Sequence, residues 1–374
     1  MNAEKRMSKD AYRSKNVGEY ESKISVAGKE YVKVEDLRYG TNPHQTAALY
    51  KPADHVAPIA DIEVLKSGKS GLSQTNYEDI SLAVNICKFF ETPTSVCMKH
   101  VNPSGVAVGQ NGEPAVRVYQ RSRDCDPQAA FGSVVVLNTT VDEDTAREIM
   151  GSFVEVVVAP EVTDAALDIL RDHETFRRNK NIRVLRCGDF TRLPRFVGDN
   201  TEGFETLTRL VDGSLIMADP LLSNLRSADE IVPASGTDKE GRTVTAECRA
   251  DERQKADLLA AWYISLNVRS NGVVLLKNGA TLAVGTGQQD RVGAVEEAVR
   301  KYERKYQGEE SMAGAVMASD GFFPFPDALD TAAEKGVSAV IAPAGALRDT
   351  QVIEHANQKG VAFCHAPERV FSHH

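Results

Sequence analysis

A lysine and a histidine stand side by side where a short apolar segment ends. Residues 95–98 form the apolar run, and Lys99-His100 leads from it into Asn102-Pro103 and Gly105, which are typical of a turn. Lysine supplies a fixed positive charge and three hydrogen-bond donors, and histidine can exchange a proton near neutral pH. The spacing predicts a strand end that presents a reactive pair. A surface loop with two incidental polar residues explains these residues equally well.

The composition limits the classes of function. The 374 residues are 42% hydrophobic and 26% charged, which is typical of a globular chain of two domains or one large composite. The net charge of −9 argues against a nucleic-acid surface, so any anion site must gather Arg and Lys locally. No apolar run reaches membrane-spanning length, and residues 1–15 lack a signal-peptide core. The six cysteines form no C-x-x-C, which predicts a reduced, cytoplasmic protein.

Strands and helices are predicted to alternate along the chain. Thr75-Asn76-Tyr77-Glu78 is typical of a capping box at a helix start. Residues 251–269 have the spacing of a long amphipathic helix, and Asn278-Gly279 indicates a hairpin between two apolar strands. Alternation of this kind is typical of α/β layers. We expect two α/β halves joined near residues 175–215, although no close internal sequence repeat is visible.

Six separated motifs, taken together with the chain's end, carry a resemblance to one enzyme family. In order they are Arg38-Tyr39-Gly40-Thr41-Asn42-Pro43-His44-Gln45, Lys99-His100-Val101-Asn102-Pro103, Asp126-Pro127 with Ala130-Phe131-Gly132, Arg269-Ser270-Asn271, Gly285-Thr286-Gly287-Gln288-Gln289-Asp290-Arg291, and Ala318-Ser319-Asp320-Gly321-Phe322-Phe323-Pro324-Phe325, followed by Arg369-Val370-Phe371-Ser372-His373. Over roughly residues 35–374 the chain resembles AICAR transformylase (phosphoribosylaminoimidazolecarboxamide formyltransferase), the transformylase part of the bifunctional purine-biosynthesis family.

The resemblance implies an architecture and an assembly. The expected fold is α/β, with two cytidine-deaminase-like three-layer domains in tandem. Residues 1–34 would be a flexible lead-in, residues 35–210 the first domain with a connecting segment, and residues 211–374 the second domain. The family forms homodimers with shared active sites. Because the lead-in has no room for the family's IMP cyclohydrolase domain, we expect a separate IMP cyclohydrolase to act downstream.

The implied reaction transfers a formyl group from the co-substrate 10-formyltetrahydrofolate to the 5-amino group of AICAR, giving formyl-AICAR for IMP biosynthesis. The amine is a poor nucleophile because its lone pair is delocalised toward the carboxamide. The site must therefore remove a proton, stabilise an oxyanion and protonate the departing folate nitrogen. The zinc signature of deaminases, H-x-E with C-x-x-C, is absent from the sequence, and no metal is expected to be required for catalysis.

Four residues are catalytic candidates by resemblance. His100 would move the proton of the AICAR amine, and Lys99 would stabilise charge at the formyl group or the leaving nitrogen. Asn271 would hold the formyl oxygen, since an amide is a suitable donor. His373 is a second candidate acid or base, and a disordered tail is the alternative interpretation.

The substrate-binding candidates follow from the same resemblance. Arg38, Arg291 and Arg369 would bind the phosphate, and Arg291 would reach the nucleotide of the neighbouring subunit. Phe322 could stack on a planar ring, although it could equally belong to the core. The remaining candidates are Tyr39 as a hydroxyl donor, Phe131 and Gly132 at the carboxamide, Glu155 near the ribose, and Asp327 on the folate side.

Three positions depart from the family pattern. Ala129 replaces a serine, Gly321 an alanine and Pro326 a basic residue, which leaves the folate pocket and the exact formyl donor open.

Two rival functions are a metal-dependent deaminase on the same fold and a non-catalytic purine-nucleotide-binding regulator derived from a transformylase. The presence of Lys99, His100 and Asn271 favours the transformylase.

Overall fold

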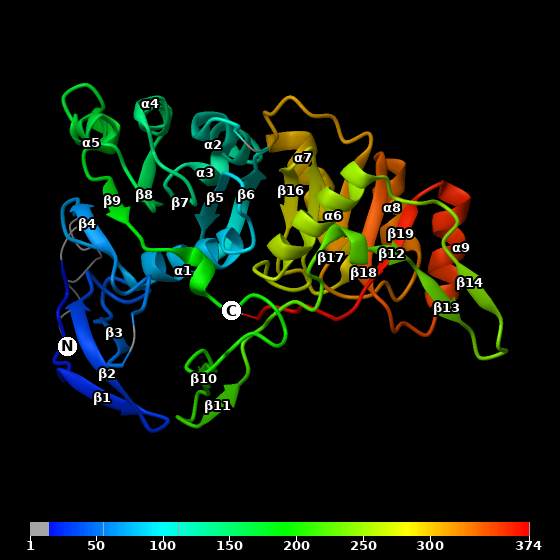
Figure 1. Ribbon diagram of the computed structural model, residues 1–374, viewed down its shortest axis with the longest axis horizontal. Coiled ribbons are helices and arrows are strands. Elements are labelled where there is room, and N and C mark those ends of the chain that lie inside the picture. The colour runs from blue at the N-terminus through cyan, green and yellow to red at the C-terminus, as the bar shows by residue number, and fades with distance from the viewer. Residues whose placement is uncertain (1–14, 55, 111, 374) are drawn as a thin grey trace, which may run out of the picture.

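The computed structural model describes residues 15–54, 56–110 and 112–373 as two α/β halves that lie side by side (Figure 1). The first half contains β4 (Glu63–Lys66), α1 (Gln74–Cys87), β5 (Thr94–Lys99), β6 (Asn102–Val108), α2 (Ala115–Asp124), α3 (Pro127–Ala130), β7 (Ser133–Leu137), α4 (Glu143–Gly151), β8 (Val154–Ala159), α5 (Asp164–Arg171) and β9 (Arg183–Arg186). The second half contains β12 (Val232–Pro233), α6 (Glu252–Ser265), β15 (Val273–Lys277), β16 (Ala280–Gly285), α7 (Arg291–Lys305), β17 (Ala315–Ser319), α8 (Asp327–Glu334), β18 (Val337–Pro343), α9 (Asp349–Lys359) and β19 (Ala362–Ala366). The predicted α/β class is confirmed.

One 12-stranded sheet runs through both halves, in the order β12-β19-β18-β17-β15-β16-β6-β5-β7-β8-β9-β4. Outward from the β6–β16 contact, each half has the same pairing: two antiparallel contacts, two parallel contacts and a last antiparallel contact. The halves therefore repeat one topology that the sequence does not reveal. Buried strands need only apolar, often β-branched residues, so the two halves can have the same topology without detectable sequence similarity.

Side chains alternate between the two faces of the sheet, which gives three layers. On one face a single core cluster extends across both halves and includes Val96 and Met98 of β5 and Trp262 of α6. On the other face each half has its own cluster, with Cys97 in the first and Leu275 in the second. Among the described residues, no helix combines the length and apolar character needed to cross a membrane.

In the part of the chain that the structure describes, three small sheets lie outside the main one. They are formed by β1 (Lys23–Val26), β2 (Lys29–Asp36) and β3 (Ala48–Pro52), by β10 (Thr206–Arg209) and β11 (Leu215–Ala218), and by β13 (Ser235–Thr237) and β14 (Thr243–Thr245). Within the expected flexible lead-in of residues 1–34, strand β1 and most of β2 are regular structure; residues 1–14 of that segment lie outside the described residues.

Two helix boundaries differ from the sequence expectation. Helix α1 begins one residue after Ser73, whose hydroxyl accepts from the amide of Asn76, so the capping box is Ser73/Asn76 rather than one opened by Thr75. The sequence interpretation required Glu or Gln at the third position, and an asparagine serves here. Helix α6 ends at Ser265, four residues before the predicted end, and the hairpin at Asn278-Gly279 is confirmed.

A threonine side chain takes part in the strand contact between the halves. Ala280 of β16 pairs with Ala107 of β6. Next to this pair the fully buried hydroxyl of Thr281 accepts from the Val106 amide at 2.9 Å and donates to the Val106 carbonyl at 3.1 Å. The side chain thus pairs both backbone groups of Val106 where the two halves meet.

We predict that Thr281→Val lowers the free energy of unfolding by about 2–4 kcal/mol, because it leaves a buried amide and a buried carbonyl unpaired. Urea unfolding measures this. Thr243→Val is the matched control: its hydroxyl bonds that of Thr237 on an exposed hairpin, and a change within about 0.5 kcal/mol is expected there. Equal losses in both variants would contradict the role given to Thr281.

Candidate active site

The predicted Lys99-His100 pair lies on a two-residue hairpin turn. Lys99 ends β5 and pairs with Asn102, the first residue of β6, so His100 and Val101 form the loop. Both loop residues have positive φ angles, 53° and 56°. The sequence interpretation placed the turn at Asn102-Pro103; instead these residues begin the strand, beside a register shift between Cys97 and Met98. A bulge of this kind accommodates a proline in a strand.

A cavity of about 470 Å³ opens beside this turn. Five of the predicted site residues line it: Arg38 and Tyr39 from the loop before β3, Lys99 and His100 from the turn, and Glu155 from β8. These residues are far apart in the sequence, and the sheet order brings β5 and β8 to the same region. We call this space the arginine cavity.

Arg38 is the buried cation of the arginine cavity. It is 7% exposed, its Nη2 donates to the Tyr39 hydroxyl at 2.8 Å, and its guanidinium lies 4.5 Å from the centre of the Tyr39 ring. Its Nε is buried with no hydrogen-bond partner among the described residues. A buried donor without a partner is costly. An anionic ligand in the cavity would accept the hydrogen bond that Nε of Arg38 does not make within the described residues.

Glu155 compensates two guanidinium groups. Its Oε1 lies 3.7 Å from Nη2 of Arg38 and accepts from Nη1 of Arg183 at 3.2 Å. Burial, followed by the nearby charge of Arg38, lowers the pKa of Arg183. The sequence interpretation expected Glu155 near a ribose and did not include Arg183. The structure gives Glu155 a second task, which is to hold two buried cations together.

Lys99 is held by the loop that follows α3. Its Nζ donates to the carbonyls of Phe131 at 2.6 Å and Gly132 at 3.2 Å. Gly132 has a φ of 74°, and a Cβ there would lie 3.1 Å from Nζ of Lys99 and 3.0 Å from the Phe153 ring. Glycine is therefore needed at this position so that the ammonium group can approach the backbone. Phe131 itself is half exposed and contacts Phe153.

Sequence reasoning missed two polar residues on α1. Asp79, 6% exposed, accepts from the Val101 amide at 2.7 Å, and Asn76, 3% exposed, donates to Glu155 at 3.4 Å. Burial raises the pKa of Asp79 to about 6, and the backbone amides of Val101 and His100 oppose that shift. The signal available in the sequence was the separation of three residues between Asn76 and Asp79, which places both polar side chains on the same face of the helix.

The remaining predicted residues gather in the second half, around Gly272 and Asp320. Arg291, 6% exposed, donates to the Gly272 carbonyl at 3.1 Å and forms an ion pair with the buried Asp320. Asn271 donates to the Gln288 carbonyl at 2.9 Å. A Cβ on Gly321 would lie 2.5 Å from the Phe371 ring and 2.6 Å from Nη2 of Arg291, so both side chains pack closely against this glycine.

The chain's end is fixed beside this second group. The Val370 amide donates to the Asp320 carbonyl at 3.0 Å, and the Ser270 amide donates to the Ser372 carbonyl at 2.9 Å. These bonds place Arg369 and His373 next to the group. Two other predicted residues lie nearby in the sequence: Phe322 is 36% exposed, and Asp327 begins α8.

The two groups meet at the Lys99–Asn102 turn. The Arg269 amide donates to Oδ1 of Asn102 at 3.0 Å. On this side a second cavity of about 290 Å³ is lined by Lys99 and His100 together with Asp126, Thr286 and Lys301. We call it the junction cavity. Lys99 and His100 therefore line two cavities, one on each side of the turn.

The buried carboxyl of Asp79 gives the stability of the protein a pH dependence. Burial raises its pKa from 3.8 to about 6, so the folded chain binds this proton more tightly than the unfolded chain. That contribution is full below about pH 4 and is lost as the pH rises through about 6. We predict that the unfolding free energy of Asp79→Asn rises by about 2–3 kcal/mol relative to the unsubstituted protein between about pH 4 and 7. Urea unfolding at each pH measures it, and a constant difference would contradict it.

Comparison with known proteins identifies the family of the chain. A model of the AICARFT/IMPCHase bienzyme family matches residues 5–301. The chain is 37% identical over 343 residues to the bifunctional purine biosynthesis protein PurH of Oceanobacillus iheyensis, an alignment that covers 92% of this chain and 60% of that relative. The PurH proteins of Anoxybacillus flavithermus and Magnetococcus marinus are each 38% identical, with the same two coverages. The chain spans about 60% of the length of these curated relatives. Because the family model covers most of its residues, the chain belongs to the AICARFT/IMPCHase bienzyme family.

Proposed function

We propose that this protein transfers the formyl group of 10-formyltetrahydrofolate to the 5-amino group of AICAR, giving formyl-AICAR in purine biosynthesis. The observation that carries the proposal is the position of Lys99 and His100, which line both the arginine cavity and the junction cavity. A transferase must hold a donor and an acceptor on either side of one set of catalytic groups. The family membership supplies the identity of the two substrates.

The arginine cavity is assigned to AICAR. Its phosphate would accept from the unpartnered Nε of Arg38, and charge-assisted bonds of this kind are stronger than neutral ones. The Tyr39 hydroxyl lines the same cavity. Phe131 and Gly132, whose carbonyls accept from Lys99, would approach the carboxamide of the nucleotide. Arg369, which is exposed beside Phe371 in the second group, would be a further phosphate ligand.

The junction cavity and the surface beyond it are assigned to the folate. Lys301 and Asp126 supply charges at its wall. Phe322 offers an exposed ring for stacking on the pterin, and Asp327 offers a carboxylate at the start of α8. The formyl carbon would then lie at the shared wall, next to Lys99 and His100.

The transfer forms one C–N bond and breaks another. The AICAR amine attacks the formyl carbon while His100 takes its proton, and the oxyanion that develops is stabilised by the Asn271 amide and the charge of Lys99. The bond from the formyl carbon to the folate nitrogen breaks, and that nitrogen receives a proton from His100 or His373. A placed acid or base contributes about 10²–10⁴-fold to the rate.

The architecture and assembly complete the proposal. We infer that residues 35–210 and 211–374 are tandem cytidine-deaminase-like domains, which the repeated strand pairing of the two halves supports. The active form is a homodimer in which Arg291 serves the nucleotide of the neighbouring subunit. In support, Arg291 belongs to the second group of residues and the AICAR ligands Arg38 and Tyr39 to the first.

We predict that His100→Ala lowers the rate of formyl transfer by at least about 10²-fold while the Kd for AICAR changes little, because proton transfer acts in the transition state. Formyl-AICAR formation and calorimetric AICAR binding measure the two quantities. His173→Ala is the control: it replaces an exposed histidine of the first half and should have normal turnover. Normal turnover of His100→Ala would remove this residue from the mechanism.

Subunit mixing tests the shared site. We predict that Lys99→Ala and Arg291→Lys are each inactive alone and that mixed dimers regain activity, because each then contains one intact site and one doubly altered site. Lysine keeps a cation beside the buried Asp320 but loses the planar guanidinium. If heterodimers form and activity does not return, both residues serve one site within a chain, and the sharing of Arg291 is wrong.

A further inference from the structure

The two halves contain the same arrangement of a helix carboxylate and a hairpin turn. In the second half, Asp257 of α6 accepts from the amides of Asn278 and Gly279, both at 2.8 Å. In the first half, Asp79 of α1 accepts from the Val101 amide at 2.7 Å. The two carboxylates are 5% and 6% exposed. Asp79 precedes Val101 by 22 residues, and Asp257 precedes Gly279 by the same 22.

The backbone of the two turns is also the same. Each is a two-residue loop, between Lys99 and Asn102 in one half and between Lys277 and Ala280 in the other. The loop residues have φ angles of 53° and 56° in the first half and 50° and 75° in the second. Two successive positive φ angles define the hairpin turn whose twist suits the flanking strands, and this turn strongly prefers Asn-Gly.

The residue types of the two turns differ in a way that matters. The second half has Asn278-Gly279, the pair that adopts this backbone most readily. The first half has His100-Val101, and a β-branched residue at positive φ is a marked outlier. The turn of the second half is therefore supported by its own sequence. The turn of the first half is opposed by its sequence and must be held from outside.

The lysine contacts are common to both halves. Lys277 donates to the carbonyls of Ser311 at 3.1 Å and Ala313 at 2.9 Å, just before β17. Lys99 donates to the carbonyls of Phe131 and Gly132, just before β7. Binding a lysine to this loop is thus a property of the repeated fold, and the histidine is what distinguishes the first turn.

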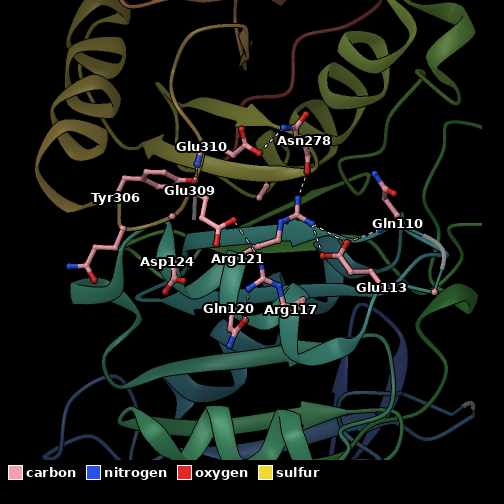
Figure 2. A pocket seen from close by; sticks show the side chains of 14 residues that line it. Gln110, Glu113, Arg117, Gln120, Arg121, Asp124, Asn278, Tyr306, Glu309 and Glu310 are labelled. Atoms are coloured by element: carbon pink, nitrogen blue, oxygen red, sulfur yellow. Dashed lines mark hydrogen bonds and ion pairs between the residues drawn. The ribbon is translucent and has the colours of Figure 1, made fainter.

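Figure 2 shows the cavity beside the second turn, of about 600 Å³, where the polar groups bind one another. Arg121 is paired with Glu113 at 3.0 Å and donates to the Asn278 carbonyl, and the side-chain amide of Asn278 donates to Glu310 at 2.7 Å. At the first turn, by contrast, His100 is exposed and lines the two cavities. The first turn therefore presents the His100 imidazole to the cavities, whereas the polar groups around the second turn are paired with one another.

We propose that Asp79 is a positioning residue, whose carboxylate holds the His100-Val101 turn in its left-handed backbone and so orients Lys99 and His100 toward the two cavities. This inference rests on the proposed function, because Lys99 and His100 are the groups that it positions. Strained backbone at functional sites persists only where the surroundings enforce it. Asn102 is held by the Arg269 amide on the other side, so the turn is fixed from both halves.

The test is a double-mutant cycle in the full-length protein. Asp79→Ala should lower kcat by about 10²-fold, the scale of a misplacement of about 1 Å, with the KM for AICAR within about threefold. Adding Val101→Gly should restore at least about tenfold of kcat, because glycine adopts positive φ without cost. Asp79→Asn keeps an acceptor oxygen and should lose less than about tenfold. A full loss that Val101→Gly does not relieve, or no loss in Asp79→Ala, overturns the proposal.

Asp257→Ala is the matched control, since it removes the equivalent carboxylate from a turn that Asn-Gly supports. Its kcat should stay within about threefold of the unsubstituted value. A loss as large as that of Asp79→Ala would show that any such carboxylate merely maintains the fold, and it would overturn the positioning role.

Hydrogen exchange gives a readout that needs neither a variant nor turnover. In the unsubstituted protein the Val101 amide should exchange at least about 10²-fold more slowly than an exposed turn amide, because it is bound to a buried carboxylate. Exchange at the rate of a free turn overturns the proposal even if the variants cannot be folded. Failure of the formyl-transfer assay in the unsubstituted protein, with a protected Val101 amide, would instead count against the proposed function alone.

Discussion

The contact between β6 and β16 brings the two groups of candidate residues together at the Lys99–Asn102 turn. These strands join two copies of one topology into a single sheet, with Thr281 pairing both backbone groups of Val106. The β5–β6 hairpin therefore ends beside the second half, and Asn102 there contacts the Arg269 backbone. Without this joint, Lys99 and His100 would face one cavity instead of two. The chemistry proposed for them depends on facing both.

Charge compensation is the second constraint. An acidic chain that binds an anion must concentrate cations, and buried cations must themselves be paired. Glu155 meets this need by contacting Arg38 and Arg183 together, while Nε of Arg38 stays buried without a partner. In the second half, the buried carboxylate of Asp320 compensates the charge of Arg291 through an ion pair. Each arginine is held rigidly before any ligand arrives, which lowers the entropy cost of binding.

Local signals in the sequence predicted much of this and missed the rest for physical reasons. The α/β class, the Asn278-Gly279 hairpin and the strand that delivers Lys99 follow from apolar spacing and turn chemistry, and all are present. The repeat was not visible, because buried strands tolerate many apolar sequences. The His100-Val101 turn was placed too late in the chain, since neither residue type favours positive φ. Asp79 and Arg183 were missed because their roles exist only after distant elements pack.

A formyl-transfer assay with purified protein tests the central claim most directly. AICAR and 10-formyltetrahydrofolate are supplied, and formyl-AICAR and tetrahydrofolate are quantified together. The account predicts both products in equal amounts, with a rate that depends on both substrates, because one pair of side chains serves two occupied cavities. If both ligands bind and no formyl-AICAR forms, Lys99 and His100 do not carry out this transfer and the account is contradicted.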